Sequence, residues 1–220
     1  MKILAVCSLM GSFGAVVAMD RVAAQTAPAT GTQLITLGTA GGPLPRANRA
    51  QSSNLLVVNG ALYLIDAGGS VTSRVVQSAH DFRKIGKIFI THPHSDHTAG
   101  LATLMVSQWE YQRAEPTDIY GGGVESLVKG ALAYLAPNAE IRWAEGKKRP
   151  MADTFKGHDI EAGIIYQDAN IKVTGGREHS LPIRARHAAL RQVQIVLLPL
   201  RYTGPFVFVH RRHRLVRCGH

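Results

Sequence analysis

One short stretch, residues 88–101 (IFITHPHSDHTAGL), constrains this 220-residue chain more than any other. Three histidines and an aspartate, His92, His94, Asp96 and His97, fall within six positions directly after an apolar run that is typical of a buried strand. Extended residues at i and i+2 project to the same side, so His92 and His94 can hold one ion. Asp96 and His97 can face a second ion as the chain turns into a helix.

The residue types in this cluster point to metal chemistry. Neutral imidazole and carboxylate are ligands for zinc, and also for manganese or iron. Two ions that share a bridging water would generate hydroxide near neutral pH and stabilise the oxyanion of an ester substrate. The alternative is a solvated polar loop with accidental histidines, but that does not explain four ligand-type residues at this spacing. We therefore expect a catalytic metal site here.

The patterns around the cluster predict an α/β layered sandwich rather than a Rossmann arrangement, because strands in hairpins alternate with helices. Asn59-Gly60 between two apolar runs predicts a β-hairpin. Ser70 is a candidate N-cap for the helix that follows it, and Pro137 is expected to end a later helix. The expected strands cover 33–38, 87–90 and 117–121, the expected helices 70–79, 98–108 and 124–135, and a second hairpin 159–174.

Two segments carry a resemblance to a known family. THPHSDHTAGL resembles the His-x-His-x-Asp-His signature of the metallo-β-lactamase fold. Upstream, LGTAGGPLPRANRAQSS and LYLIDAGG are similar to the N-terminal strands of the ribonuclease Z and arylsulfatase-like branch. The resemblance covers residues 33–174. It implies an αββα metallo-β-lactamase sandwich, incomplete in this chain, with a two-metal site at the sheet edge.

The resemblance also implies roles for individual residues. His92 and His94 would hold one zinc ion, and Asp96 and His97 a second. Asp96 would be the catalytic residue that orients or deprotonates the attacking water. Asp66 would orient the ligand loop from behind. A second interpretation, which does not exclude the first, is that Asp66 is a strand-end carboxylate that caps the two glycines at 68–69.

Three further metal ligands of the family have no matching motif in this chain: a third histidine, an aspartate in a TGDTG-like strand end and a last histidine. His179 stands near the first of these but in a different context. One extra base near Gly175 would explain the loss, because the shifted reading frame permits a string that contains TGDTG. The missing histidine would then fall at Ser180 and the missing aspartate at Arg212. A divergent natural C-terminus is the alternative.

These observations predict three segments. Residues 1–24 have the composition of a signal peptide, with an N-terminal membrane anchor as the alternative. Residues 25–174 would form the metallo-β-lactamase-like domain, and residues 175–220 an out-of-frame, poorly ordered tail. The tail holds nine arginines, no lysine and one glutamate, a net charge of +8, whereas residues 1–174 carry +2. The basic character of the protein therefore belongs to the tail.

The expected function is that of a periplasmic or secreted metal-dependent hydrolase that cleaves a sulfate ester, a phosphodiester or a lactone. Activity would be impaired because the bridging aspartate is missing. We expect a small-molecule ester as substrate, no stable membrane anchor and no nucleic-acid partner, because export argues against a tRNA substrate. The alternative is a non-catalytic pseudoenzyme or a nucleic-acid-binding protein with a basic tail. The sequence leaves the substrate, the metal and the oligomeric state open.

Overall fold

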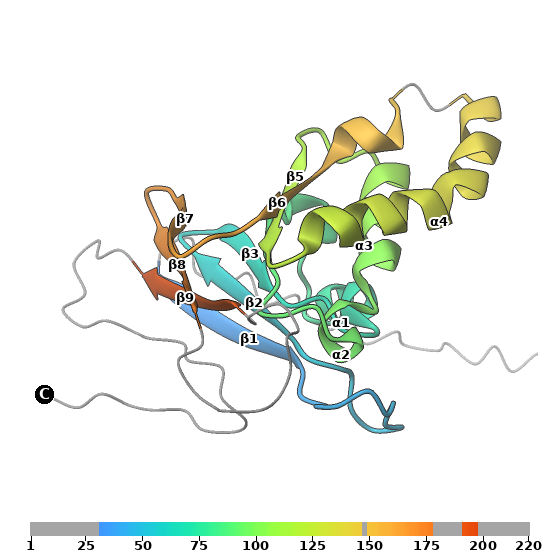
Figure 1. Cartoon of the computed structure of the whole chain (residues 1–220). Coiled ribbons are helices and arrows are strands. Elements are labelled where there is room, and N and C mark those ends of the chain that lie inside the picture. The colour runs from blue at the N-terminus through green and yellow to red at the C-terminus, as the bar shows by residue number, and fades with distance from the viewer. Residues whose placement is uncertain (1–30, 147–148, 178–190, 198–220) are drawn as a thin grey trace, which may run out of the picture.

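A computed structural model describes residues 31–146, 149–177 and 191–197 of the chain (Figure 1). Its main feature is a six-stranded sheet in the order β1-β2-β3-β4-β5-β6, followed by a separate sheet in the order β7-β8-β9. Strands β1 to β3 are antiparallel, β3 to β6 run parallel, and β7 to β9 are antiparallel. The strands are β1 (Thr32–Gly38), β2 (Ser53–Val58), β3 (Ala61–Ile65), β4 (Lys87–Phe89), β5 (Thr117–Gly121), β6 (Phe155–Asp159), β7 (Gly163–Gln167), β8 (Ile171–Arg177) and β9 (Arg191–Leu197). The helices are α1 (Val71–Gln77), α2 (Ser95–Thr98), α3 (Leu101–Glu110) and α4 (Val124–Ala144), with short 3₁₀ turns η1 (Phe82–Lys84) and η2 (Met151–Thr154).

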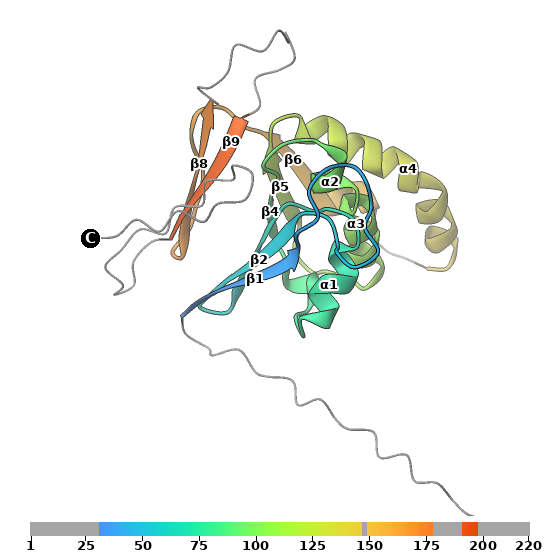
Figure 2. The same ribbon diagram turned by 90° about the horizontal axis from the view of Figure 1, so that it is seen from below.

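The elements form layers. The helices lie on one face of the large sheet and the small sheet lies on the other (Figure 2). One apolar cluster, with Leu64, Ile88 and Leu104 fully buried, fills the space between helices and sheet. A second cluster, which includes Phe89 and Ile171, fills the space between the two sheets. The described residues thus supply three layers of the expected incomplete α/β sandwich.

Local sequence signals explain most of the elements near the site. Asn59 and Gly60 have φ of 49° and 82°, so both central residues of the β2–β3 turn are left-handed, as a tight hairpin requires. The predicted hairpin is confirmed. The second predicted hairpin is also present, as β7 and β8 around residues 168–170, but its first residue, Asp159, belongs to β6 instead.

One local prediction is wrong, and two others are confirmed only in part. Pro137 lies inside α4 rather than after its end, and α4 changes direction along its length (Figure 1). Leu135 before the proline and Ala139 after it both pack on the core, which holds the two halves in helical conformation. The helix expected over 98–108 is divided into α2 and α3 at Gly100. Ser70 stands at the N-cap position of α1, as expected, but its side chain makes no capping hydrogen bond.

The ends of the chain bear on the predicted segments. The expected signal peptide, residues 1–24, lies outside the described residues. Within the expected tail, residues 175–177 end β8 and residues 191–197 form β9, which pairs with β8; the rest of the tail lies outside the described residues. The segment boundaries stay predictions. In the part of the chain that the structure describes, no helix is long and apolar enough to cross a membrane.

A polar network at the β7–β8 turn fastens the small sheet to the large one. The Asp168 carboxylate accepts hydrogen bonds from the Tyr63 hydroxyl (2.6 Å) and the Tyr166 hydroxyl (2.7 Å), and from the backbone N–H groups of Asn170 and Ile171. Burial opposes ionisation of Asp168, but these hydrogen bonds outweigh it, so the pKa of Asp168 is lowered. Tyr63 belongs to β3, so this contact crosses between the sheets.

Replacing Asp168 with alanine should lower the free energy of unfolding by about 2 kcal/mol, because two half-buried hydroxyls lose their acceptor. Urea unfolding of the purified chain measures this. Alanine at the exposed Asp153 is the matched control and should change stability by less than about 0.5 kcal/mol. Since the folded pKa of Asp168 is lowered, its contribution is complete above the unfolded pKa near 4 and disappears as the pH falls through the folded value. Equal losses in both variants would contradict the anchoring role.

Candidate metal centre

The histidine cluster lies directly after β4, at the carboxyl end of a parallel strand. This edge is where ligand sites of open α/β sheets lie, because loops rather than regular strands supply the side chains. The rings of His92 and His94 are 4.7 Å apart between centroids, and those of His92 and His97 are 4.0 Å apart. The structure therefore brings the three predicted histidines together. His97 is buried, whereas His94 is exposed.

Asp66 stands behind this cluster at the end of β3. Its side chain is 1% exposed, and its φ of 61° is left-handed, a conformation that aspartate tolerates better than most residues. The carboxylate accepts hydrogen bonds from the Thr91 backbone N–H (2.8 Å), the Thr91 hydroxyl (2.9 Å) and His97 Nδ1 (2.7 Å). Asp66 thus fixes the ligand loop from the side that faces the core.

In these contacts the Asp66 carboxylate does not cap Gly68 and Gly69. The N–H of Gly68 donates to the carbonyl of Ser52 (3.0 Å), and the N–H of Gly69 donates to the Gln51 side chain (2.9 Å). Both glycine N–H groups therefore have partners from the β2 side of the site.

Glycine is required where the two loops touch. A Cβ on Gly68 would collide with the backbone carbonyl of Asp96, and a Cβ on Gly100 would collide with the carbonyl of Gly68. Ala67 N–H donates to the His97 carbonyl (2.8 Å), and Gly100 N–H donates to the Ala67 carbonyl (2.8 Å). The close backbone approach carries Asp66 within reach of His97.

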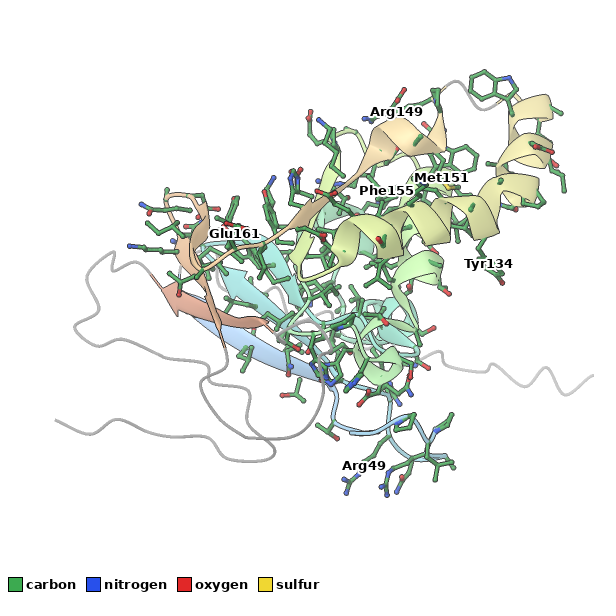
Figure 3. All side chains as sticks on the ribbon, in the orientation of Figure 1. Arg49, Tyr134, Arg149, Met151, Phe155 and Glu161 are labelled. Carbon is green, nitrogen blue, oxygen red and sulfur yellow. The ribbon has the colours of Figure 1, made fainter. Side chains whose placement is uncertain are left out.

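Asp96 makes contacts on the opposite side of the cluster. It is 6% exposed, and its Oδ2 lies 3.5 Å from Nε2 of His97. The same oxygen accepts a 2.6 Å hydrogen bond from the backbone N–H of Gly42. Gly42 belongs to a loop whose residues 41–49 are all exposed and which carries Arg46 and Arg49 (Figure 3). Asp96 therefore ties this basic loop to the site.

The surroundings of His97 act on its protonation in opposite directions. Burial disfavours the charged ring, but the hydrogen bond to Asp66 and the charges of Asp66 and Asp96 favour it. The net effect is a raised pKa for His97. Because Nδ1 bonds to Asp66, Nε2 is the nitrogen that faces Asp96 and the site.

The donor set fits a zinc-type ion in kind. Imidazole nitrogen and carboxylate oxygen are its usual ligands, and a histidine whose other nitrogen bonds a carboxylate is the usual arrangement of such a ligand. In arrangement the side chains do not form a closed cage. Among the described residues, no group of three or more histidine, cysteine, aspartate or glutamate side chains is placed to hold an ion. The same donor types also suit manganese and iron.

Sequence reasoning missed two contributors. Thr91 contacts Asp66, His92 and His97, and its signal was its place between a buried strand and the cluster. Gly42 is 54 residues from Asp96, and no local pattern marks it. His179, Ser180 and Arg212, which the frame argument singled out, lie outside the described residues.

Comparison with known proteins places this site in a family. The family model described as "Anti-Pycsar protein Apyc1" matches residues 32–188. Ribonuclease Z of Lacticaseibacillus casei (strain BL23) is 32% identical over 145 residues, which cover 64% of this chain and 42% of the relative. Ribonuclease Z of Geobacillus kaustophilus (strain HTA426) is 31% identical over 155 residues, 68% of this chain and 46% of the relative. The chain thus spans less than half the length of either enzyme.

Two solved structures share the fold. The short form of human tRNase Z (ELAC1) superposes with a TM-score of 0.53 at 20% identity and covers 75% of this chain and 63% of its own. The metallo-β-lactamase-fold protein YhfI from Bacillus subtilis superposes with a TM-score of 0.52 at 18% identity. The match covers 76% of this chain and 57% of YhfI. Both confirm the metallo-β-lactamase type of α/β sandwich.

One expectation from the sequence is wrong. A small-molecule ester as substrate and the absence of a nucleic-acid partner were inferred from the supposed export of the protein. The curated relatives are ribonucleases by name, so enzymes similar in sequence to this chain act on RNA. The leader that suggested export lies outside the described residues and does not outweigh this finding.

The cluster, the Asp66 contacts and the layered sheets agree with these matches, and the family model covers well over half of the chain. The chain belongs to the anti-Pycsar protein Apyc1 family and has the metallo-β-lactamase fold of hydrolases that resemble ribonuclease Z.

Proposed function

We propose that this protein is a metal-dependent phosphodiesterase that acts on RNA. The observation that carries the proposal is the convergence of His92, His94 and His97 beside the buried Asp66–Thr91 contact, at the loop edge of the sheet. The ribonuclease Z relatives support RNA as the substrate class.

Different residues of the site would have different roles. His92 and His94 would hold one divalent cation, and Asp96 and His97 a second. A bound cation supplies a Lewis acid that acidifies water and offsets phosphate charge. Asp96 would orient the attacking water and accept its proton, while the oxygen attacks phosphorus and the bond to the leaving oxygen breaks. The hydrogen bond from Gly42 N–H holds the Asp96 carboxylate for this task.

The loop over residues 41–49 supports a polyanionic substrate. Arg46 and Arg49 are exposed on it, and Gly42 connects it to Asp96 (Figure 3). Two guanidinium groups on a loop that is tied to Asp96 through Gly42 favour phosphate, because the planar fork of arginine matches phosphate oxygens. Residues 1–174 carry a net charge of only +2, so the positive charge of these two arginines is local to the loop.

We also propose that turnover by this chain is weak. The TGDTG-like aspartate that the resemblance implies has no counterpart in a matching motif, and arginine stands at 212, where the shifted reading frame would place it. A missing ligand lowers metal affinity, and a positive charge there would oppose a cation rather than balance it. Complete loss of turnover would make the chain the non-catalytic pseudoenzyme of the alternative interpretation.

Alanine at both His92 and His94 should abolish zinc-dependent cleavage of a 3′-extended RNA and lower the zinc content of the purified protein. The reason is that both ligands of one ion are lost. Alanine at His80 and His158 removes two imidazoles outside the cluster and is the matched control; it should change neither measurement. The proposed function would be sunk if the His92 and His94 variant kept both its zinc and its RNA cleavage.

Restoring the reading frame near codon 175 should raise RNA cleavage by about 100-fold or more, since loss of even an outer partner of a metal ligand costs 10-fold to 100-fold. Sequencing the gene across this codon and assaying both products with and without a chelator makes the comparison. An unbroken frame in the gene, or equal cleavage by the two proteins, would instead establish the divergent natural C-terminus.

A further inference from the structure

The hydroxyl of Thr91 lies at the meeting point of three site residues. Thr91 is 8% exposed, and its Oγ1 lies 2.9 Å and 3.0 Å from the two carboxylate oxygens of Asp66. The same oxygen lies 3.2 Å from Nδ1 of His92 and 3.4 Å from Nδ1 of His97. A buried hydroxyl with this many neighbours must assign its single proton to one of them.

Counting protons fixes the direction of these hydrogen bonds. A carboxylate only accepts, so the Thr91 hydroxyl proton points to Asp66. The lone pairs of Oγ1 then remain for a donor. His97 Nδ1 already donates to Asp66 at 2.7 Å, which is shorter than its 3.4 Å separation from Thr91. His92 Nδ1, at 3.2 Å, is therefore the donor to Thr91.

We propose that Thr91 is a positioning residue that relays the hydrogen bond of Asp66 to His92, so that one carboxylate sets the tautomer of two histidines. His97 receives its orientation directly from Asp66, and His92 receives it through the Thr91 hydroxyl. Both rings then carry their proton on Nδ1 and turn the Nε2 lone pair toward the site. The use of this lone pair for a metal ion rests on the proposed function, but the tautomers do not.

The backbone makes the relay rigid. Thr91 N–H also donates to Asp66, at 2.8 Å, so the residue is held to the carboxylate at two points. The branched Cβ of threonine restricts the first side-chain torsion, which keeps the hydroxyl between Asp66 and His92. Valine has the same shape without the hydroxyl, so Thr91→Val removes the relay while it keeps the volume.

The test measures tautomers in the full-length, metal-free chain labelled with ¹⁵N-histidine. At a pH high enough for both rings to be neutral, which is higher for His97 because its pKa is raised, two-bond ¹H–¹⁵N spectra distinguish Nδ1–H from Nε2–H rings. In the wild-type protein, His92 and His97 should both be Nδ1–H. In Thr91→Val, His92 should change to Nε2–H while His97 keeps Nδ1–H through Asp66. Thr91→Ser should restore the wild-type pattern.

A second measurement separates positioning from general stability. Zinc affinity, by competition with a chromophoric chelator, should fall about 10-fold to 100-fold in Thr91→Val and recover in Thr91→Ser. Thr117→Val is the matched control: its buried hydroxyl donates to Gln108 at 2.9 Å inside the core. This variant should lose stability but keep both tautomers and the wild-type zinc affinity.

The outcomes are distinct. An Nε2–H ring at His92 in the wild-type protein, or an unchanged His92 in Thr91→Val, overturns the relay. Equal loss of zinc affinity in Thr117→Val and Thr91→Val also overturns it. The wild-type measurement decides the question even where Thr91→Val does not fold. Expected tautomers without any RNA cleavage would uphold the relay and reject the proposed function.

Discussion

The buried hydrogen bond between Asp66 and His97 is the contact on which the site depends. The two residues are 31 positions apart, and both side chains are at least 95% buried. A buried carboxylate without a partner is costly, so the contact is specified strongly once the loops approach. The glycines at 68 and 100 permit that approach, and the carboxylate then sets the position of the whole loop from Thr91 to His97.

The layered architecture places this contact where chemistry can use it. The helical layer and the large sheet provide an apolar core below the loops, and the small sheet closes the other face through the Asp168 network. The cluster stays at the loop edge, where His94 and the loop over residues 41–49 are exposed. The core therefore supplies rigidity, and the irregular segments supply the residues that the proposed metal site would use, together with the basic residues.

Much of this was visible in the sequence because the signals are local. The Asn59-Gly60 pair predicts a tight turn. The spacing of His92, His94, Asp96 and His97 predicts a metal site. The contact of Gly42 with Asp96 was not visible, because it joins positions 54 residues apart and depends on the path of an exposed loop. The hydroxyl of Thr91 was missed although Thr91 lies between a buried strand and the cluster, because its contact with Asp66 joins positions 25 residues apart.

The errors have physical causes as well. A proline predicts the end of a helix from local geometry, but packing of Leu135 and Ala139 on the core carries α4 past Pro137. The expectation of a small-molecule substrate was wrong because it rested on a short N-terminal segment rather than on the motifs. The N-terminal strands and the cluster belong to the part of the chain that matches relatives named ribonuclease Z, and this match is what contradicts that expectation.

Anomalous diffraction at the zinc absorption edge, from crystals of this chain soaked in zinc, tests the central claim most directly. The account predicts anomalous peaks within bonding distance of Nε2 of His92 and of His97, with Nδ1 of His97 still bonded to Asp66. Zinc bound only elsewhere, for example at the His158–Asp118 pair, or bound through Nδ1 of His97 with Asp66 displaced, would contradict it.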